Sequence, residues 1–166
     1  MSSVAAARLS GSYPRRKPSS TQLQIQDCAG GTAQTWAVPM GHGEITGYQN
    51  LCVDDRNAST ADSNPIDIHG CNHTAAQQWT VESDGTLRVL GKCLDVRGGA
   101  TANRTPVQLY TCNGTGAQQW RPQGDGSLIN PQSTRCLDDP AFATTPGTQL
   151  EIHDCNSGAN QKWALP

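Results

Sequence analysis

The chain has 166 residues, of which 35% are hydrophobic, 5% aromatic and 16% charged, a composition that predicts one folded domain rather than a disordered chain. No stretch reaches the roughly 18 consecutive apolar residues of a membrane-spanning helix, and residues 1–20 lack the apolar block of a secretory signal. The net charge is -2, but residues 1–20 carry four basic side chains and no acid, which leaves -6 on the remainder. This acidic remainder argues against nucleic-acid binding, because phosphate neutralisation needs a basic face.

The N-terminal part of the chain differs from the remainder in composition and in pattern. Residues 1–20 are expected to form a flexible basic segment, since Arg15, Arg16 and Lys17 lie among proline and serine. Residues 21–42 are expected to be a partial repeat and linker, because they reproduce only the second half of a unit that recurs later. Cys28 in this segment has no cysteine at the expected spacing before it. We expect a monomer with a free Cys28 thiol, and the alternative is a Cys28-linked dimer.

A repeat dominates the rest of the sequence. Four segments end in a similar pattern, with a tryptophan two residues after a glutamine and eight residues after a cysteine. The four tryptophans are Trp36, Trp79, Trp120 and Trp163. A Cys-apolar-Asp triplet begins at Cys52, Cys93 and Cys136. These motifs define three complete repeats, or lobes, at residues 43–82, 84–123 and 125–166.

Each repeat contains short strand signals and no segment of helical period. Residues 84–86 form a turn, residues 87–90 a short apolar strand, and residues 106–110 an alternating strand after the Cys-apolar-Asp strand. The sequence therefore predicts an all-β fold. Four short strands per repeat, three times over, must close on themselves to cover their edges.

Six of the seven cysteines form three pairs at a constant separation of 19 residues. Spacing alone allows other connectivities, but the repeat symmetry favours Cys52–Cys71, Cys93–Cys112 and Cys136–Cys155. Zinc-binding thiolates are a weaker interpretation, because the chain has no Cys-x2-Cys pair. Disulfides indicate an oxidising compartment, so we expect a secreted or extracellular protein although no signal peptide is visible.

The sequence resembles the ricin B-type lectin domain. The resemblance rests on units of about 40 residues, each with a Cys-Leu/Val-Asp triplet, a second cysteine and a terminal Gln-x-Trp. The pattern is most similar to the bacterial family 13 carbohydrate-binding modules of secreted glycoside hydrolases. The resemblance covers residues 43–166 throughout and residues 21–36 in part. It implies a β-trefoil of three pseudo-symmetric lobes and a role in sugar binding.

The resemblance also implies which side chains would bind sugar in each lobe. An aspartate accepts hydrogen bonds from two hydroxyls, a ring two residues before the second cysteine stacks on the sugar, and amides complete the site. The second lobe is the most complete, and its candidates are Asp95, Gln108, Tyr110, Asn113 and Gln118. The first lobe offers Asp54, His69, Asn72 and Gln77. The third lobe offers Asp138, His153, Asn156, Asn160 and Gln161.

The remaining histidines, tryptophans and acidic residues are interpreted as structural residues rather than as parts of a site. His42 and His73 are expected in loops, and the four tryptophans are expected in the core rather than in sugar sites. Asp67 and Glu151 occupy the place of Gln108 in their own lobes. The doublets Asp54-Asp55 and Asp138-Asp139 should point to opposite faces of a strand, which does not suit the paired carboxylates of a glycosidase.

The sequence therefore predicts a non-catalytic carbohydrate-binding module that targets a secreted glycoside hydrolase or acts as a small lectin. It is expected to need no cofactor or metal and to contain no membrane span. The alternative is a β-trefoil for protein interaction or dimerisation, with degenerate sugar sites.

Overall fold

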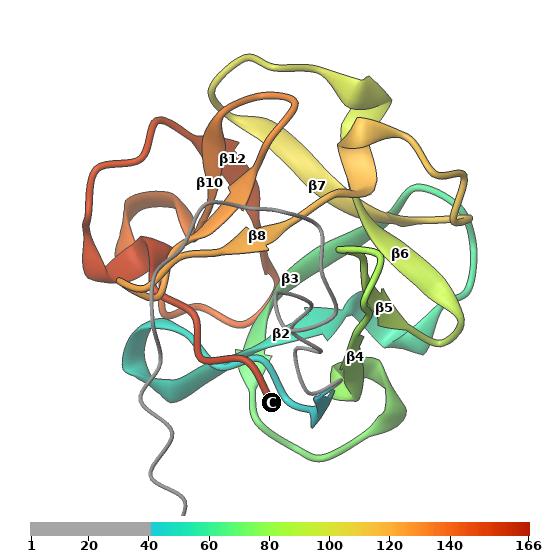
Figure 1. The fold of residues 1–166 in the computed structure, drawn as a ribbon. Helices are drawn as coiled ribbons and strands as arrows, with labels where there is room; N and C mark the ends of the chain where they lie inside the picture. The colour runs from blue at the N-terminus through green and yellow to red at the C-terminus, as the bar shows by residue number, and fades with distance from the viewer. Residues whose placement is uncertain (1–40) are drawn as a thin grey trace, which may run out of the picture. The chain divides into compact units, whose positions relative to one another are not determined.

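The structure is a computed structural model that describes residues 41–166, and its strands repeat in the three units that the sequence predicted (Figure 1). The expectations for residues 1–40, including Cys28, lie outside the described residues. The first unit contains β1 (His42–Gly43), β2 (Leu51–Asp55), β3 (Asn64–Gly70) and β4 (Trp79–Val81). The second contains β5 (Leu87–Val89), β6 (Lys92–Val96), β7 (Thr105–Tyr110) and β8 (Arg121–Pro122). The third contains β9 (Leu128–Asn130), β10 (Arg135–Asp138), β11 (Thr148–Gln149) and β12 (Glu151–His153).

The three units are joined through their central strands. Each unit pairs its Cys-apolar-Asp strand with the alternating strand next along the chain, as in β2 with β3, β6 with β7 and β10 with β12. In addition, β3 pairs with β7, β7 with β12, and β11 with β3. These three pairings close a ring, so the central strands present no free edge. The fold is the threefold all-β fold that the repeats predicted, and it is the β-trefoil that the family resemblance implied.

Short 3₁₀ turns connect the strands. They are η2 (Tyr48–Asn50), η3 (Arg56–Ala58), η4 (Ala75–Gln77), η5 (Arg97–Gly99), η6 (Gly116–Gln118), η7 (Pro140–Phe142) and η8 (Ala159–Gln161). Within residues 41–166, none of these helical turns has the length or the apolar character needed to cross a membrane. The turns matter for function because η3, η5 and η7 come directly after the aspartate strands, whereas η4, η6 and η8 carry the glutamine of Gln-x-Trp.

The core repeats with the sequence. Each unit supplies the apolar residue of Cys-apolar-Asp, two residues of the alternating strand, and the tryptophan. These buried residues are Val53, Ile66, Ile68, Trp79, Leu94, Val107, Leu109, Trp120, Leu137, Leu150, Ile152 and Trp163. Each of the three tryptophan indoles donates a hydrogen bond to the backbone carbonyl of its own triplet's apolar residue, at 2.8–3.0 Å. The tryptophans of the described chain are therefore core residues, and they fix the glutamine of each Gln-x-Trp behind the aspartate strand.

Three details differ from the sequence prediction. His42 was expected in a loop but lies in β1, where it pairs with Thr80. The alternating strand of the third unit is split at Leu150 into β11 and β12, because it pairs with β3 on one side and β7 on the other. The fourth strand of that unit is reduced to a bridge between Ala164 and Thr46.

The disulfides are Cys52–Cys71, Cys93–Cys112 and Cys136–Cys155, the pairing that the repeat symmetry favoured. Removing one bridge, as in a Cys93→Ser, Cys112→Ser double variant, should lower the free energy of unfolding by about 3 kcal/mol, since it frees a loop of about twenty residues in the unfolded chain. Urea denaturation would measure the loss. A change below about 1 kcal/mol would show that the bridge does not stabilise the fold.

Candidate functional site

The same polar arrangement occurs at one place in each lobe, and the register of two strands creates it. In lobe 2, Asp95 on β6 faces Gln108 on β7, and Cys93 faces Tyr110. Side chains two residues apart on a strand share a face, so Asp95, Gln108 and Tyr110 lie on the same side of this hairpin. The disulfide of Cys93 holds the loop that begins at Asn113 against the hairpin.

A buried glutamine connects the aspartate to this loop. Gln118 donates from Nε2 to Asp95 Oδ2 at 3.0 Å and to the Thr111 carbonyl at 3.0 Å, and its Oε1 accepts the Asn113 N–H at 2.8 Å. Gln108 donates to Asp95 Oδ1 at 2.9 Å. Both glutamines are buried and position the groups around them; Gln118 lies behind the pocket, whereas Gln108 forms part of its wall.

Lobe 2 has a pocket of about 530 Å³, whose lining includes Asp95, Gln108, Tyr110 and Asn113. Each Asp95 oxygen accepts one amide, so an ionised carboxylate keeps lone pairs for two further donors. Tyr110 is half-buried at the wall, and Asn113 is exposed. Asn113 Oδ1 accepts from the backbone and hydroxyl of Thr115, which leaves the Asn113 amide N–H groups available. The pocket thus combines an acceptor, a donor and a flat ring.

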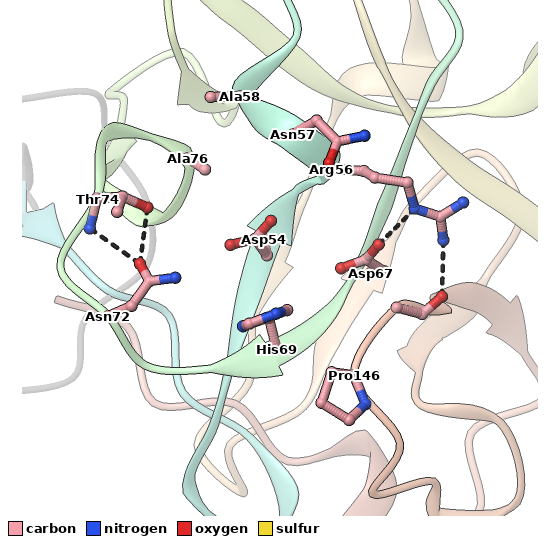
Figure 2. A pocket seen from close by; sticks show the side chains of 11 residues that line it. Asp54, Arg56, Asn57, Ala58, Asp67, His69, Asn72, Thr74, Ala76 and Pro146 are labelled. Carbon is pink, nitrogen blue, oxygen red and sulfur yellow. Dashed lines mark hydrogen bonds and ion pairs between the residues drawn. The ribbon is translucent and has the colours of Figure 1, made fainter.

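Lobe 1 has an equivalent pocket of about 480 Å³, with Asp54, His69 and Asn72 around its opening (Figure 2). Gln77 is fully buried, donates to Asp54 Oδ2 at 2.8 Å and accepts the Asn72 N–H at 2.8 Å. His69 is exposed on β3 and takes the place of Tyr110. The ring at this position is therefore smaller than in lobe 2.

An ion pair within lobe 1, whose arginine also reaches lobe 3, forms one side of the lobe 1 pocket (Figure 2). Arg56 Nε lies 2.7 Å from Asp67 Oδ2, and Arg56 Nη2 donates to the Gly147 carbonyl of lobe 3 at 2.7 Å. Burial raises the pKa of Asp67, and the Arg56 guanidinium opposes this rise. The second carboxylate of this pocket is thus paired within the protein.

Lobe 3 brings together Asp138, Asn156, Asn160 and Gln161. Asn160 and Gln161 both donate to Asp138 Oδ1, at 2.9 and 2.7 Å, and Gln161 accepts the Asn156 N–H at 2.9 Å. Asn160 and Gln161 are buried behind the aspartate. His153 is half-buried on β12 opposite Cys136. Within residues 41–166, all the site residues named from the sequence thus cluster lobe by lobe.

Burial affects the pKa of the lobe 2 and lobe 3 aspartates. It raises the pKa of Asp95 above its ordinary value, and the amides of Gln108 and Gln118 oppose this rise. It also raises the pKa of Asp138, against hydrogen bonds from Gln161 and Asn160 and the charge of His153. Amide donors therefore help to keep a partly desolvated carboxylate in its accepting, ionised form.

Sequence reasoning missed several wall residues of the two pockets. In lobe 2 these include Arg97, which donates to Gln108 at 3.3 Å, and Gln132, which belongs to lobe 3. In lobe 1 they include Arg56 and two lobe 3 residues, Pro146 and Gly147. The shared position of Arg56 and Arg97, two residues after the aspartate, was a visible signal. The contributions from lobe 3 were not, because they depend on how the lobes pack.

The part of the chain that holds these pockets also matches a known family. A family model for the ricin-type beta-trefoil lectin domain matches residues 41–163. The chain belongs to this family. Membership supports carbohydrate binding, and the pockets of lobes 1 and 2 lie within the matched residues.

Individual relatives are similar over different spans. A glucan endo-1,3-beta-glucosidase of Cellulosimicrobium cellulans is 43% identical over 55 residues, which are 33% of this chain and 10% of that protein. The designed threefold symmetric protein ThreeFoil has a TM-score of 0.69 and 29% identity, over 75% of this chain and 96% of that one.

A non-toxic homologue of type II ribosome-inactivating proteins from Momordica charantia, solved in complex with alpha-methyl-D-galactoside, has a TM-score of 0.67 and 28% identity. The match covers 76% of this chain and 48% of that one. This chain spans a tenth or less of the curated relatives it matches. The similarity to these relatives is therefore to a part of each protein.

Proposed function

We propose that residues 43–166 form a non-catalytic carbohydrate-binding module of a secreted protein, which targets a glycoside hydrolase to its polysaccharide or acts as a lectin. The observation that carries the proposal is the lobe 2 pocket, where the Asp95 carboxylate lies between two buried amides and beside Tyr110 and Asn113. Such a set can accept from paired hydroxyls, donate to a ring or hydroxyl oxygen, and stack on the apolar face of a pyranose.

Two further observations support this proposal. The family is a lectin family, and the three disulfides suit an extracellular environment. The matched relatives include an enzyme named for 1,3-β-glucan and a protein solved with a galactoside. Galactose-type, xylose-type and 1,3-β-linked glucose saccharides are therefore the ligands to test. Single open pockets bind weakly, and we expect avidity from lobes that engage one chain together.

The test is an NMR titration of the oxidised protein with lactose, xylo-oligosaccharides and laminari-oligosaccharides. We expect saturable amide shifts at Asp95, Tyr110 and Asn113. Tyr110→Ala should weaken binding in lobe 2 about tenfold, because it removes the stacking ring, and should change the free energy of unfolding by less than about 1 kcal/mol.

His69→Ala is the matched control, since it alters the equivalent position of lobe 1 and should leave the lobe 2 shifts unchanged. If millimolar concentrations of every sugar gave no shift, the sugar-binding proposal would be wrong. A trefoil that serves protein interaction would then be the better interpretation.

A further inference from the structure

The turns η3, η5 and η7 occupy equivalent places after the three aspartates, but their third residues differ. These residues are Ala58, Gly99 and Phe142. Ala58 lines the lobe 1 pocket and Gly99 lines the lobe 2 pocket. In lobe 3, a phenylalanine therefore stands where the other two lobes have almost no side chain.

A second position in the pocket wall also differs in lobe 3. Ala76 and Ala117 precede the buried glutamines in lobes 1 and 2 and line their pockets, and Figure 2 shows Ala76 and Ala58 on the side of the lobe 1 pocket away from Pro146. Lobe 3 has Asn160 at this position. Asn160 is 4% exposed and donates inward to Asp138, so it offers no surface to a ligand. At this wall of lobe 3, the exposed side chain is that of Phe142.

The Phe142 ring is held in place but not covered. Tyr48 meets it edge-on, with 5.4 Å between ring centroids and 78° between ring planes. A Cβ built on Gly158 would lie 3.4 Å from Phe142 Cζ and 2.8 Å from Asn156 Oδ1, so the ring lies beside the asparagine loop of the lobe 3 site. The side chain remains 46% exposed, and it is the one large hydrophobic residue exposed to this degree within residues 41–166.

The backbone beneath the ring is an unfavourable one for phenylalanine. Phe142 has φ of 55° and Ala141 has φ of 56°, whereas lobe 2 has two glycines at these positions. The left-handed region disfavours bulky side chains, and strained residues persist where the surrounding structure fixes them, often at ligand sites. Core packing does not account for this ring, because Phe142 is outside the core cluster.

We propose that Phe142 is the aromatic platform of a third sugar site, in which Asp138 and Asn156 bind the hydroxyls of a pyranose and Phe142 stacks on its apolar face. This inference rests on the proposed function. In lobe 2 the ring comes from the strand, at Tyr110, and in lobe 3 that strand position is His153. The platform has moved from strand to turn, so lobe 3 holds a sugar in another orientation and differs from lobe 2 in preference.

The chain contains a single phenylalanine, so 4-fluorophenylalanine labels this position alone. We expect one ¹⁹F resonance that shifts saturably on titration with lactose, xylotriose or laminaritriose, with the Asn113 amide followed in the same samples as the lobe 2 reporter. Asn156→Ala should abolish the ¹⁹F response and leave the Asn113 response intact. Phe142→Leu, which keeps apolar bulk without a ring, should weaken lobe 3 binding at least fivefold, and Phe142→Tyr should restore it.

The outcomes separate this inference from the proposed function. If the Asn113 amide responds to a sugar and the ¹⁹F resonance does not, the Phe142 platform is wrong and sugar binding in lobe 2 stands. If neither responds to any of the three sugars, both are wrong. If Phe142→Leu tightens binding at the Asn156 amide, the ring obstructs the site and the platform is again overturned.

Discussion

Replacing Gln118 with alanine should destabilise the protein by about 2–4 kcal/mol and remove sugar binding in lobe 2 at the same time. The side chain is fully buried and makes three hydrogen bonds, to Asp95, Thr111 and Asn113. Truncation leaves a desolvated carboxylate without one of its two amide donors and opens a cavity beneath the pocket. Both effects lower the free energy of unfolding. A buried polar group without a partner has lost its hydrogen bonds to water and forms none in the protein to replace them.

The matched control is Gln119→Ala, the next residue, whose side chain is only half-buried. We expect it to change the free energy of unfolding by less than about 1 kcal/mol and to leave binding intact. Urea denaturation with a parallel lactose titration measures both quantities. If Gln118→Ala unfolded at the same urea concentration as Gln119→Ala, the view that this glutamine joins the site to the core would be wrong.

Joint loss of stability and binding distinguishes Gln118 from Tyr110. Tyr110 contacts the pocket from its wall and should contribute to binding alone, whereas Gln118 contributes through the geometry of Asp95 and Asn113. The same distinction applies in lobes 1 and 3, where Gln77 and Gln161 make the corresponding bonds. Variants of the three glutamines should therefore lower the free energy of unfolding, and they should weaken sugar binding as a consequence of the altered site geometry.

The repeat and the family resemblance together made the fold and much of the site predictable. The constant offsets between cysteine, aspartate and tryptophan predicted three all-β repeats, and the repeat symmetry favoured the three disulfides. The resemblance to the ricin B-type lectin domain implied the trefoil and placed Asp95, Tyr110 and Asn113 in one site. The predictions of the disulfides and of the site concern contacts within a lobe, where sequence spacing sets the geometry.

Contacts between lobes could not be predicted in this way. The bond from Arg56 to the Gly147 carbonyl joins residues 91 positions apart, and Gln132 reaches the lobe 2 pocket from lobe 3. Both depend on the angle at which complete lobes pack. Phe142 was missed for another reason: the family pattern places the ring on the strand, and His153 occupies that position in lobe 3.

The second residues of the acidic doublets, Asp55 and Asp139, also became informative only in the structure. Asp55 is fully buried and accepts from Asn64 at 2.6 Å, while its Oδ2 has no partner among the described residues. Asp139 is 1% exposed, and neither of its carboxylate oxygens has a hydrogen-bond partner within the described chain. Lobe 2 has Val96 at this position, so the fold does not require a carboxylate there.

Burial raises the pKa of both carboxyls from 3.8 to about 6. For Asp139, the charge of Asp138 adds to this rise, and the nearby Ala143 backbone N–H opposes it although it does not reach hydrogen-bond geometry. Because the folded state then binds protons more tightly than the unfolded state, the free energy of unfolding falls as pH rises from about 4 to about 6. The destabilisation is complete above this window and absent below it.

Exposed aspartates change the pH dependence of stability in the opposite direction. Hydrogen bonds and neighbouring cations lower the pKa of Asp84, Asp125 and Asp154, so these residues contribute stability above the ordinary aspartate pKa and lose it in stronger acid. As the pH rises from about 4 to about 6, the destabilisation by Asp55 and Asp139 therefore opposes the stability that the exposed aspartates contribute. A protein with only the exposed aspartates would be most stable at higher pH.

Asp139→Val should therefore stabilise the protein at pH 8 and have a smaller effect at pH 4.5. Two pKa units correspond to at most about 3 kcal/mol, and we expect roughly 1–2 kcal/mol because local relaxation and water reduce the cost of the buried charge. Val96→Asp is the converse variant and should introduce the same pH dependence into lobe 2. Urea denaturation at the two pH values measures both, and a wild-type protein equally stable at pH 4.5 and pH 8 would contradict the argument.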